Sequence, residues 1–338
     1  MMSAMRAAVL HGPRDIRIET RGVLAPAAGE AVVRVSASGL CGTDYRIWSG
    51  DRPVAYPLIM GHEFIGEVAA VGAGVSTLRP GQRVAVEPNF SCGVCPLCRE
   101  GNRNLCLSRT AVGIDVNGGF AEQACVPARC CWPAPAGIEP DQLMLAEPLA
   151  VVVRAVARGD AVAGESAAVL GVGALGLLAI QVLKAKGLRV LAVARVGRRE
   201  ELARALGADG FATTEGGGST EAARTFSGRE GVDLVVETAG TALAVEQAIG
   251  LARPGGRVVL TGLPHEASTV NFFSVVRREI RIVGSMIYQQ EFPEAIALLS
   301  EGKVRAGDLV THRFPLERLA DAFVAHRSPD AIKVSVTT

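Results

Sequence analysis

SAAVLGVGALGLLAI, residues 166–180, is the stretch of sequence that decides the fold. It begins with an apolar run typical of a buried strand and leads into the helical pattern LLAIQVLKAKG, with Gly171, Gly173 and Gly176 in between. Glycines at this spacing let a backbone approach a pyrophosphate at a helix N-terminus, where the partial positive charge favours an anion. Glycines also serve close helix-to-sheet packing, so the triplet has to be judged in its context.

Strand-like and helical runs alternate beyond this stretch. LRVLAVAR, VDLVVETAG, GGRVVLTG and IRIVGSM are interrupted by helical stretches such as REELARALGA and TALAVEQAIGLA. This alternation predicts the α/β class, with a doubly wound parallel sheet. In that setting the glycine triplet favours nucleotide binding, and the residues expected to contact the cofactor are Gly171, Gly173, Ala174, Leu175 and Gly176.

The next strand indicates which nucleotide binds. An acidic residue near its end would accept a hydrogen bond from the ribose 2′-hydroxyl of NAD, but none lies between Gly176 and Glu200. The strand ends in Arg195 instead, and Arg199 follows shortly after. Guanidinium groups suit a 2′-phosphate, so the sequence favours NADP. If these arginines are only a solvated helix start, NAD binds without its usual acidic partner.

The first 147 residues have a different pattern. The runs AAVL, DIRIET, EAVVRVSASG, IGEVAAVG and QRVAVEP alternate with Gly and Pro turns, which predicts a β-rich unit. The chain ends in KVSVTT, a short strand that could return to that unit. With 338 residues the chain is long enough for two domains, which we place at 1–148 with 290–338 and at 149–289.

Four of the eight cysteines lie within SCGVCPLCREGNRNLC, residues 91–106. Thiolates at i, i+3 and i+6 on a tight loop can converge on one ion at about 2.3 Å, and a fourth closes a tetrahedron without an open position. The alternative, free thiols or a redox switch, is less favoured because the loop is polar. We therefore interpret this loop as a structural zinc site formed by Cys92, Cys95, Cys98 and Cys106.

A second set of metal-ligating residue types is spread over the motifs CGTD, GHE and AEPLA. A thiolate, an imidazole and carboxylates together suit a catalytic zinc with a free position. Taken singly, Cys41 could be a small buried residue, His62 a core histidine and Glu147 a charge beside a helix start. In an extended chain His62 and Glu63 point to opposite faces, so Glu63 lies behind the ligands unless the backbone turns there.

Composition excludes several classes of partner. The formal net charge is +1, so no strong field recruits nucleic acid or an anionic membrane. The longest apolar stretch is short for a membrane span and contains three glycines, and the N-terminus shows no secretory signal. We therefore expect a cytoplasmic protein that acts on a small molecule.

Taken together, these motifs resemble those of the zinc-dependent medium-chain alcohol dehydrogenases, and most closely the branch of sorbitol, threonine and sugar-acid dehydrogenases. The matching elements CGTD, GHEFIGEV, the four-cysteine loop, GGFAEQ, AEPLAV and GVGALG span nearly the whole chain. The resemblance implies a GroES-like catalytic domain, a Rossmann domain, two zinc ions per chain and an active site in the cleft between the domains. It also implies a homodimer or homotetramer.

The resemblance also implies roles for individual residues. Cys41, His62 and Glu63 resemble the catalytic zinc ligands, and Glu147 resembles a further ligand or a carboxylate close behind them. Thr43 resembles the hydroxyl that takes the proton of the alcohol.

The position of Arg46 departs from the family pattern, which commonly has a histidine there as the outer end of a proton relay. Arginine does not deprotonate in this pH range. Either protons leave by another route, or the position recognises an anionic group of the substrate. The resemblance suggests a substrate pocket that includes Arg46, Trp48 and Tyr288.

The resulting hypothesis is a reversible oxidation of a secondary alcohol, such as a polyol or sugar acid, to the ketone with NADP or NAD. One alternative is a zinc-free quinone or enone reductase of the same superfamily. The other is a catalytically silent scaffold whose zinc loop serves binding or redox sensing.

Overall fold

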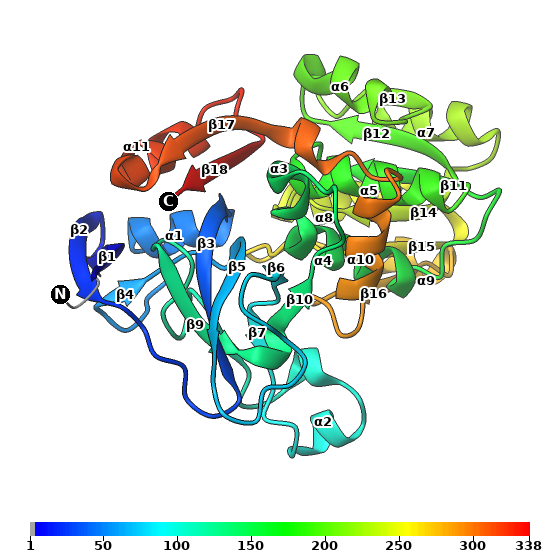
Figure 1. The fold of residues 1–338 in the computed structure, drawn as a ribbon. Coiled ribbons are helices and arrows are strands. Elements are labelled where there is room, and N and C mark those ends of the chain that lie inside the picture. The colour runs from blue at the N-terminus through cyan, green and yellow to red at the C-terminus, as the bar shows by residue number, and fades with distance from the viewer. Residues whose placement is uncertain (1–3) are drawn as a thin grey trace. The chain divides into compact units, whose positions relative to one another are not determined.

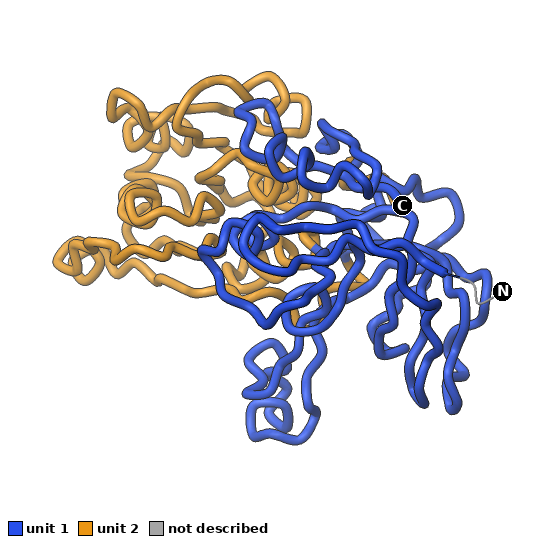
Figure 2. Tube along the Cα trace, turned by 90° about the vertical axis from the view of Figure 1, so that its left-hand side faces the viewer, with its two compact units in different colours: residues 1–147, 295–300, 306–338 blue, residues 148–294, 301–305 orange. Residues whose placement is uncertain are grey.

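The computed structural model describes residues 4–338, which fall into two compact units. Unit 1 contains the chain up to Glu147 together with residues 295–300 and 306–338. Unit 2 contains residues 148–294 and 301–305. Figure 2 shows the two units in different colours, and Figure 1 labels the elements.

Unit 1 is built mainly from antiparallel strands. One sheet has the order β2-β1-β4, a larger one runs β10-β6-β5-β3-β18-β17 with β9 also paired to β3, and a small third sheet is β7-β8. The strands are β1 (Ala4–Gly12), β2 (Asp15–Gly22), β3 (Glu30–Leu40), β4 (Leu58–Ile59), β5 (Glu63–Val71), β6 (Arg83–Val86), β7 (Asn89–Phe90), β8 (Thr110–Ala111), β9 (Gln123–Pro127), β10 (Cys131–Pro133), β17 (Val310–Pro315) and β18 (Lys333–Thr337). The β-rich prediction for this part of the chain is therefore confirmed.

The C-terminal strand returns to unit 1, as the sequence predicts. Strand β18 pairs antiparallel with β3, with Val334 opposite Leu40 and Ser335 opposite Gly39. On its other side β3 pairs with β5, where Gly39 lies opposite Glu63. Three segments far apart in the sequence therefore lie side by side at this end of the sheet.

Short helices complete unit 1. They are α1 (Gly42–Ser49), α2 (Pro96–Arg99), α3 (Pro140–Leu143), α11 (Leu319–His326) and the 3-10 turns η1 (Arg103–Leu105), η2 (Ala128–Cys130), η4 (Ala306–Leu309) and η5 (Leu316–Arg318). Helices α4 (Ala146–Arg158) and α10 (Phe292–Ser300) each contain residues of both units. The β-rich pattern of the sequence did not predict α1, which follows directly after β3.

Unit 2 is a six-stranded parallel sheet with the order β13-β12-β11-β14-β15-β16. Its strands are β11 (Ser166–Leu170), β12 (Arg189–Ala194), β13 (Gly210–Thr213), β14 (Val232–Glu237), β15 (Ala252–Leu260) and β16 (Arg281–Gly284). The connecting helices are α5 (Ala174–Ala185), α6 (Glu200–Ala205), α7 (Ser219–Ser227), α8 (Ala242–Leu251) and α9 (Phe272–Arg277), with a 3-10 turn η3 (Gly197–Arg199). The predicted α/β class and doubly wound parallel sheet are confirmed, although the sequence did not reveal β13.

Strand β11 has β12 on one side and β14 on the other, so the strand order changes direction at β11. In such sheets ligands bind at this change of direction, outside the carboxyl ends of the strands. The glycine triplet follows β11 directly. Aliphatic residues of the strands and of α8 form the apolar core of this unit, among them Ala168, Leu191, Val235 and Val258. Within residues 4–338 no helix has both the length and the apolar character needed to cross a bilayer.

A buried carboxylate ties three strands of unit 2 together at the end opposite to the glycine triplet. Asp233 on β14 accepts hydrogen bonds from the Ser166 backbone N–H at 2.9 Å, from its hydroxyl at 2.7 Å and from Arg253 Nε at 2.7 Å. Burial by itself disfavours the charged form, but these donors outweigh it and hold the pKa of Asp233 at about 2.

We expect Asp233→Asn to lower the free energy of unfolding by about 2 kcal/mol at pH 7, because the ionised form is favoured in the folded state. The pKa of this carboxyl is about 2 in the folded protein, against its usual 3.8. The contribution is therefore present above about pH 4 and disappears as the pH falls through about 2. Urea unfolding of both proteins at pH 7 and at lower pH measures this, with exposed Glu266→Gln as the control. A stability difference that does not shrink on acidification would contradict the assignment.

Candidate functional site

Three predicted ligands converge at one end of the large sheet of unit 1. Cys41 follows β3, and His62 and Glu63 stand at the start of β5, which is paired to β3. One possible ligand atom from each of the three lies within 4.8 Å of the others. The alternation of an extended chain would have separated His62 from Glu63. Gly61 has a φ of +93°, so the backbone turns just before the strand and both side chains reach the same place.

A buried carboxylate orients the imidazole of His62. Asp44, on the first turn of α1, places Oδ1 3.1 Å from His62 Nδ1 and accepts the Cys41 backbone N–H on Oδ2 at 2.9 Å. This contact leaves His62 Nε2 available to a metal, an arrangement common around histidine ligands. Burial works against a protonated ring, but Asp44 and Cys41 outweigh it and raise the pKa of His62 well above its usual value. The environment therefore attracts a cation.

Glu63 makes a second contact that sequence reasoning missed. Its carboxylate pairs with Lys333 of β18, with Nζ 2.9 Å from Oε1 and 2.6 Å from Oε2, and both side chains are buried. Burial disfavours the charge of Lys333, but Glu63, together with Cys41 and Glu147, outweighs that effect and raises the pKa of the lysine. The carboxylate can cross strand β3 to reach Lys333 because Gly39 lies between them without a side chain.

We expect Gly39→Ala to disrupt this site. A Cβ at Gly39 would lie 2.3 Å from Glu63 Oε2, so the carboxylate must move away from Lys333. Such overpacking costs about 1–3 kcal/mol of stability, and we expect turnover and bound zinc to fall as well. Denaturation, elemental analysis and steady-state kinetics measure the three effects. The control is Gly12→Ala, because a Cβ there meets nothing within 4 Å. Equal metal content and activity in both variants would contradict the role given to Gly39.

The other predicted members of the site lie close by in unit 1. Thr43 is partly buried on α1, and its hydroxyl makes no hydrogen bond to any residue from 4 to 338. Glu147 is buried and close enough to Lys333 to raise the pKa of that lysine. It is not one of the three residues whose ligand atoms lie within 4.8 Å of one another. Its role as a ligand stays a prediction.

The three predicted pocket residues have different surroundings. Trp48 stacks on Phe323, with ring centroids 5.0 Å apart and an interplanar angle of 3°, and thus packs against the unit 1 core. Tyr288 is buried in unit 2 and meets Phe292 edge-on at 5.7 Å. Arg46 is partly buried on α1. Packing accounts for the contacts of the first two residues but not for Arg46.

The four predicted structural ligands also converge. Sγ–Sγ distances are 3.5 Å for Cys106 and Cys92, 3.9 Å for Cys95 and Cys106, and 4.0 Å for Cys92 and Cys98. A tetrahedral zinc with bonds of about 2.3 Å to sulfur requires edges of about 3.8 Å. Backbone N–H groups of Leu107 and Cys98 lower the pKa of Cys95 to about 6, which favours a thiolate there. The donor set and its spacing fit a closed zinc site.

In unit 2 the glycine triplet forms a tight turn between β11 and α5. Gly171 has a φ of +101°, and a Cβ on Gly176 would lie 1.8 Å from the Gly171 carbonyl oxygen, so neither position accepts a side chain. Gly173 is the N-cap of α5, and no side chain among the described residues caps that helix start. The first N–H groups of α5, including those of Ala174 and Leu175, therefore remain available to an anion.

Thr238, directly after β14, supports this turn. Its hydroxyl donates to the Gly171 carbonyl oxygen at 2.9 Å. A Cβ on Gly176 would lie 3.0 Å from the same Thr238 hydroxyl oxygen. From the other side Arg199 Nη1 donates to the Val172 carbonyl oxygen at 2.8 Å. The predicted arginine cluster therefore reaches the glycine turn, and Arg195 is exposed nearby in the chain.

Buried polar atoms without partners mark the carboxyl ends of three neighbouring strands. Among residues 4–338, no hydrogen-bond partner is found for Glu237 Oε2, Thr261 Oγ1 or Ser285 Oγ. These residues end or directly follow β14, β15 and β16, which are adjacent in the sheet. Unsatisfied buried polar groups are costly, so their accumulation at one strand edge fits a polar ligand such as a nicotinamide nucleotide.

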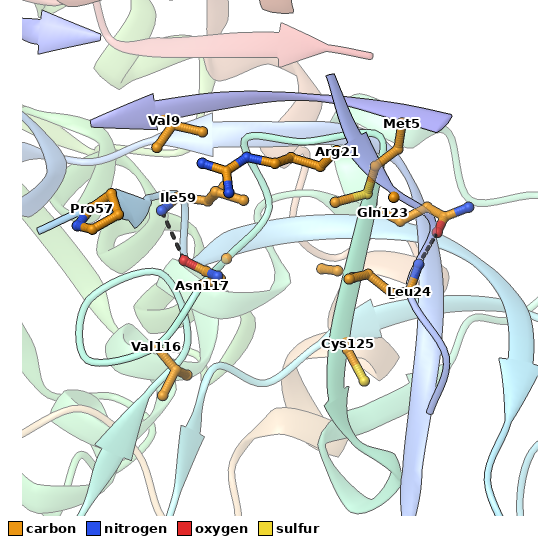
Figure 3. A pocket seen from close by; sticks show the side chains of 13 residues that line it. Met5, Val9, Arg21, Leu24, Pro57, Ile59, Val116, Asn117, Gln123 and Cys125 are labelled. Carbon is orange, nitrogen blue, oxygen red and sulfur yellow. Dashed lines mark hydrogen bonds between the residues drawn. The ribbon is translucent and has the colours of Figure 1, made fainter. Parts of the chain in front are cut away.

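A groove of about 400 Å³ lies elsewhere in unit 1 (Figure 3). Strands β1, β2 and β9 and the 116–118 segment line it, and Asn117 accepts the Ile59 backbone N–H at 3.0 Å. Arg21 at its wall is paired with Glu19 at 2.5 Å. None of the predicted site residues lines this groove.

Comparison with known proteins gives matches over most of the chain. The family model of the alcohol dehydrogenase GroES-like domain matches residues 27–136, and that of the zinc-binding dehydrogenases matches residues 174–301. A sorbitol dehydrogenase of Bacillus subtilis is 34% identical over 325 residues, 94% of this chain and 92% of that protein. An L-galactonate-5-dehydrogenase of Escherichia coli is 32% identical over 325 residues, 95% of each chain.

A solved structure agrees with these matches. The crystal structure of a zinc-binding dehydrogenase from Sinorhizobium meliloti bound to NADP superposes with a TM-score of 0.95 at 33% identity. The match covers 99% of this chain and 100% of that one.

Proposed function

Since the chain belongs to the zinc-dependent medium-chain alcohol dehydrogenases and is therefore an NAD(P)-dependent alcohol oxidoreductase, we propose that it oxidises a secondary alcohol of the polyol or sugar-acid class to the ketone and prefers NADP. The observation that carries the proposal is the convergence of Cys41, His62 and Glu63 within 4.8 Å. A thiolate, an imidazole and a carboxylate are the ligands of a zinc that keeps a position for substrate.

When bound, zinc acts as a Lewis acid that favours ionisation of the alcohol, and the nicotinamide accepts the hydride. Cys41, His62 and Glu63 would hold the metal, and Asp44 fixes the tautomer and direction of the imidazole. Lys333 pairs with both oxygens of the buried Glu63 carboxylate and so balances a carboxylate charge at this place.

Thr43 is the residue to which we assign the proton of the alcohol. Its hydroxyl can accept one hydrogen bond and donate another, so it can take that proton and release its own. Arg46 cannot be the next member of a relay because its guanidinium does not deprotonate. We therefore assign the remaining proton path to water.

In unit 2 the glycine turn and the start of α5 would bind the pyrophosphate. Arg199 lies against this turn, and Arg195 is exposed without a partner among the described residues. NAD-binding enzymes have an acidic residue near the end of the second strand of this fold. Here β12 is followed by Arg195 and Arg199 instead. This arrangement supports a preference for NADP, with Arg195 as the residue free to bind the 2′-phosphate.

We expect Arg195→Gln to lower kcat/KM for NADP about tenfold or more and to leave that for NAD nearly unchanged, because only the 2′-phosphate needs the guanidinium. Parallel kinetics with both nucleotides measure the ratio, and a fluorescence titration with NADPH measures binding directly. Arg224→Gln removes the same charge from an exposed position of α7 in unit 2 and serves as the control. A wild-type enzyme that strongly prefers NAD would overturn the preference.

The function as a whole is tested with a panel of polyols, aldonates and simple secondary alcohols, each with NAD and NADP, together with elemental analysis. We expect two zinc ions per chain and reduction of the nucleotide by at least one alcohol. One zinc per chain with reduction of quinones or enones would favour the zinc-free reductase. Absence of nucleotide binding would favour a silent scaffold.

We also propose a homo-oligomer, supported by an exposed apolar surface on unit 2. Phe272, Phe273 and Val276 of α9 are 67%, 72% and 75% exposed. Strand β16, which follows α9 in the chain, is at the edge of the sheet. Exposed aromatic side chains in such a cluster are typical of surfaces that associate.

A further inference from the structure

Arg46 shares a face of α1 with Thr43. Side chains three residues apart on a helix are neighbours, so α1 has one face with Asp44 and Ile47 and another with Thr43 and Arg46. The first of these faces is buried, and Asp44 on it contacts His62. The face with Thr43 and Arg46 carries the Thr43 hydroxyl, which takes the proton of the alcohol in the proposed function.

The guanidinium of Arg46 has no partner within the described chain. Arg46 is partly buried, and so is Arg52, whose backbone N–H donates to the Arg46 carbonyl oxygen at 2.9 Å. No residue from 4 to 338 hydrogen-bonds, pairs with or stacks on either guanidinium. The two nearest acidic residues in the sequence have other partners: Asp44 contacts His62 and the Cys41 backbone N–H, and Asp51 accepts a hydrogen bond from the Ser49 hydroxyl.

This situation differs from that of arginines elsewhere in the chain. Arg17 and Arg318 are more exposed, yet each pairs with a carboxylate at 2.7 Å. A cation that is partly withdrawn from water without a counter-charge is unfavourable. Arg46 and Arg52 are joined by a backbone hydrogen bond, and both carry such an uncompensated cation, Arg46 on the Thr43 face of α1. These observations point to an anion from outside the chain as the counter-charge.

We propose that Arg46, with Arg52 beside it, binds an anionic group of the substrate, so that the enzyme acts on a sugar acid or sugar phosphate rather than on a neutral polyol. The inference rests on the proposed function. A guanidinium presents paired N–H donors that match the oxygens of a carboxylate or phosphate. Thr43 and Arg46 are about 4.5 Å apart along the helix axis, so a short sugar acid could contact both.

The first test compares substrates of equal carbon number. Sorbitol, gluconate and sorbitol 6-phosphate are assayed with the zinc-loaded enzyme, and the two anions distinguish carboxylate from phosphate recognition. We expect one anionic substrate to have the highest kcat/KM. Arg46→Gln should lower the kcat/KM of that anionic substrate by about 10- to 100-fold, mainly through KM. This loss should be at least tenfold larger than the loss of kcat/KM for sorbitol.

Two further variants sharpen this comparison. Arg46→Lys keeps the charge without the paired donors, so we expect it to recover part of the loss. Arg79→Gln removes an exposed positive charge elsewhere in unit 1. In this variant we expect the ratio of kcat/KM for the anionic substrate to kcat/KM for sorbitol to stay at the wild-type value.

The second test measures binding without turnover. Calorimetric titration of the preferred anion into the enzyme with NADPH should show binding to the wild type that is lost or at least tenfold weaker in Arg46→Gln. Equal binding to both proteins overturns the proposal. The proposal is also overturned if Arg46→Gln binds NADPH more weakly to the same extent with every substrate, because Arg46 would then bind the nucleotide. If no alcohol is oxidised with either nucleotide, the proposed function fails, and the calorimetry still decides the role of Arg46.

Discussion

Cys41→Ser is expected to reduce turnover about a thousandfold while the protein stays folded. Cys41 is one of the three converging residues that we propose as zinc ligands, and a serine hydroxyl ionises too weakly to replace its thiolate. Loss of the metal removes several kcal/mol of stabilisation of the developing charge, and each 1.4 kcal/mol corresponds to about tenfold in rate. In the fold, Cys41 donates its backbone N–H to Asp44, and its side chain belongs to the capping box at the start of α1. The substitution leaves the first contact in place, and serine is itself a favourable capping residue.

Three measurements check this expectation. Steady-state kinetics should show the loss of turnover, elemental analysis should show one zinc per chain instead of two, and thermal unfolding should remain close to wild type. Cys125→Ser is the matched control, because Cys125 is another partly buried cysteine of unit 1 and donates to Glu30 at 3.2 Å, which a serine can also do. Full turnover in Cys41→Ser would remove the catalytic assignment.

Cys95→Ser is expected to have the opposite profile, with a large loss of stability at the four-cysteine loop. Only very short elements order this loop, namely α2, η1 and the two-residue strands β7 and β8. Val94, Leu105 and Leu107 are 66%, 48% and 75% exposed, so the loop has little apolar core of its own. The zinc that we propose there would therefore supply most of the folding free energy of the loop, and its loss should cost about 3 kcal/mol or more.

Chemical denaturation and limited proteolysis measure this effect. We expect one zinc per chain, a lower free energy of unfolding and faster cleavage between residues 91 and 107. Val94→Ser, an exposed substitution in the same loop, should change stability by no more than about 0.5 kcal/mol. If Cys95→Ser had wild-type stability and protease resistance, the four cysteines would not be a structural site.

Sequence patterns predicted most of the fold because they depend on neighbouring residues. The apolar runs after residue 165 became β11, β12, β14, β15 and β16 in the expected order. The sequence did not reveal the short strand β13, which has only four residues, or α1, which follows a strand without a long amphipathic pattern. The spacing of the four cysteines likewise predicted that their thiols converge, and three Sγ–Sγ distances lie between 3.5 and 4.0 Å; their role as zinc ligands stays a prediction.

The candidate catalytic site was predicted only in part. The residue types of Cys41 and His62 pointed to a metal, but the strand rule placed Glu63 on the opposite face, and the turn at Gly61 brings it to the same place. Nothing in the local sequence around Lys333 marks it as a partner of Glu63, because the two residues are 270 positions apart.

The sequence by itself therefore determined which chemical groups this protein has and which local turns they occupy: thiolates at metal-ligand spacing, a glycine turn before a helix, and arginines where an acidic residue is usual. The tertiary structure decided which of these groups meet. Strand β18 pairs with β3, which carries Gly39 across from Glu63, and only this pairing lets Lys333 reach the carboxylate. The physical reason is that local patterns depend on residues a few positions apart, whereas burial, charge pairing and the unpaired state of Arg46 depend on strands and helices that fold together from distant parts of the chain.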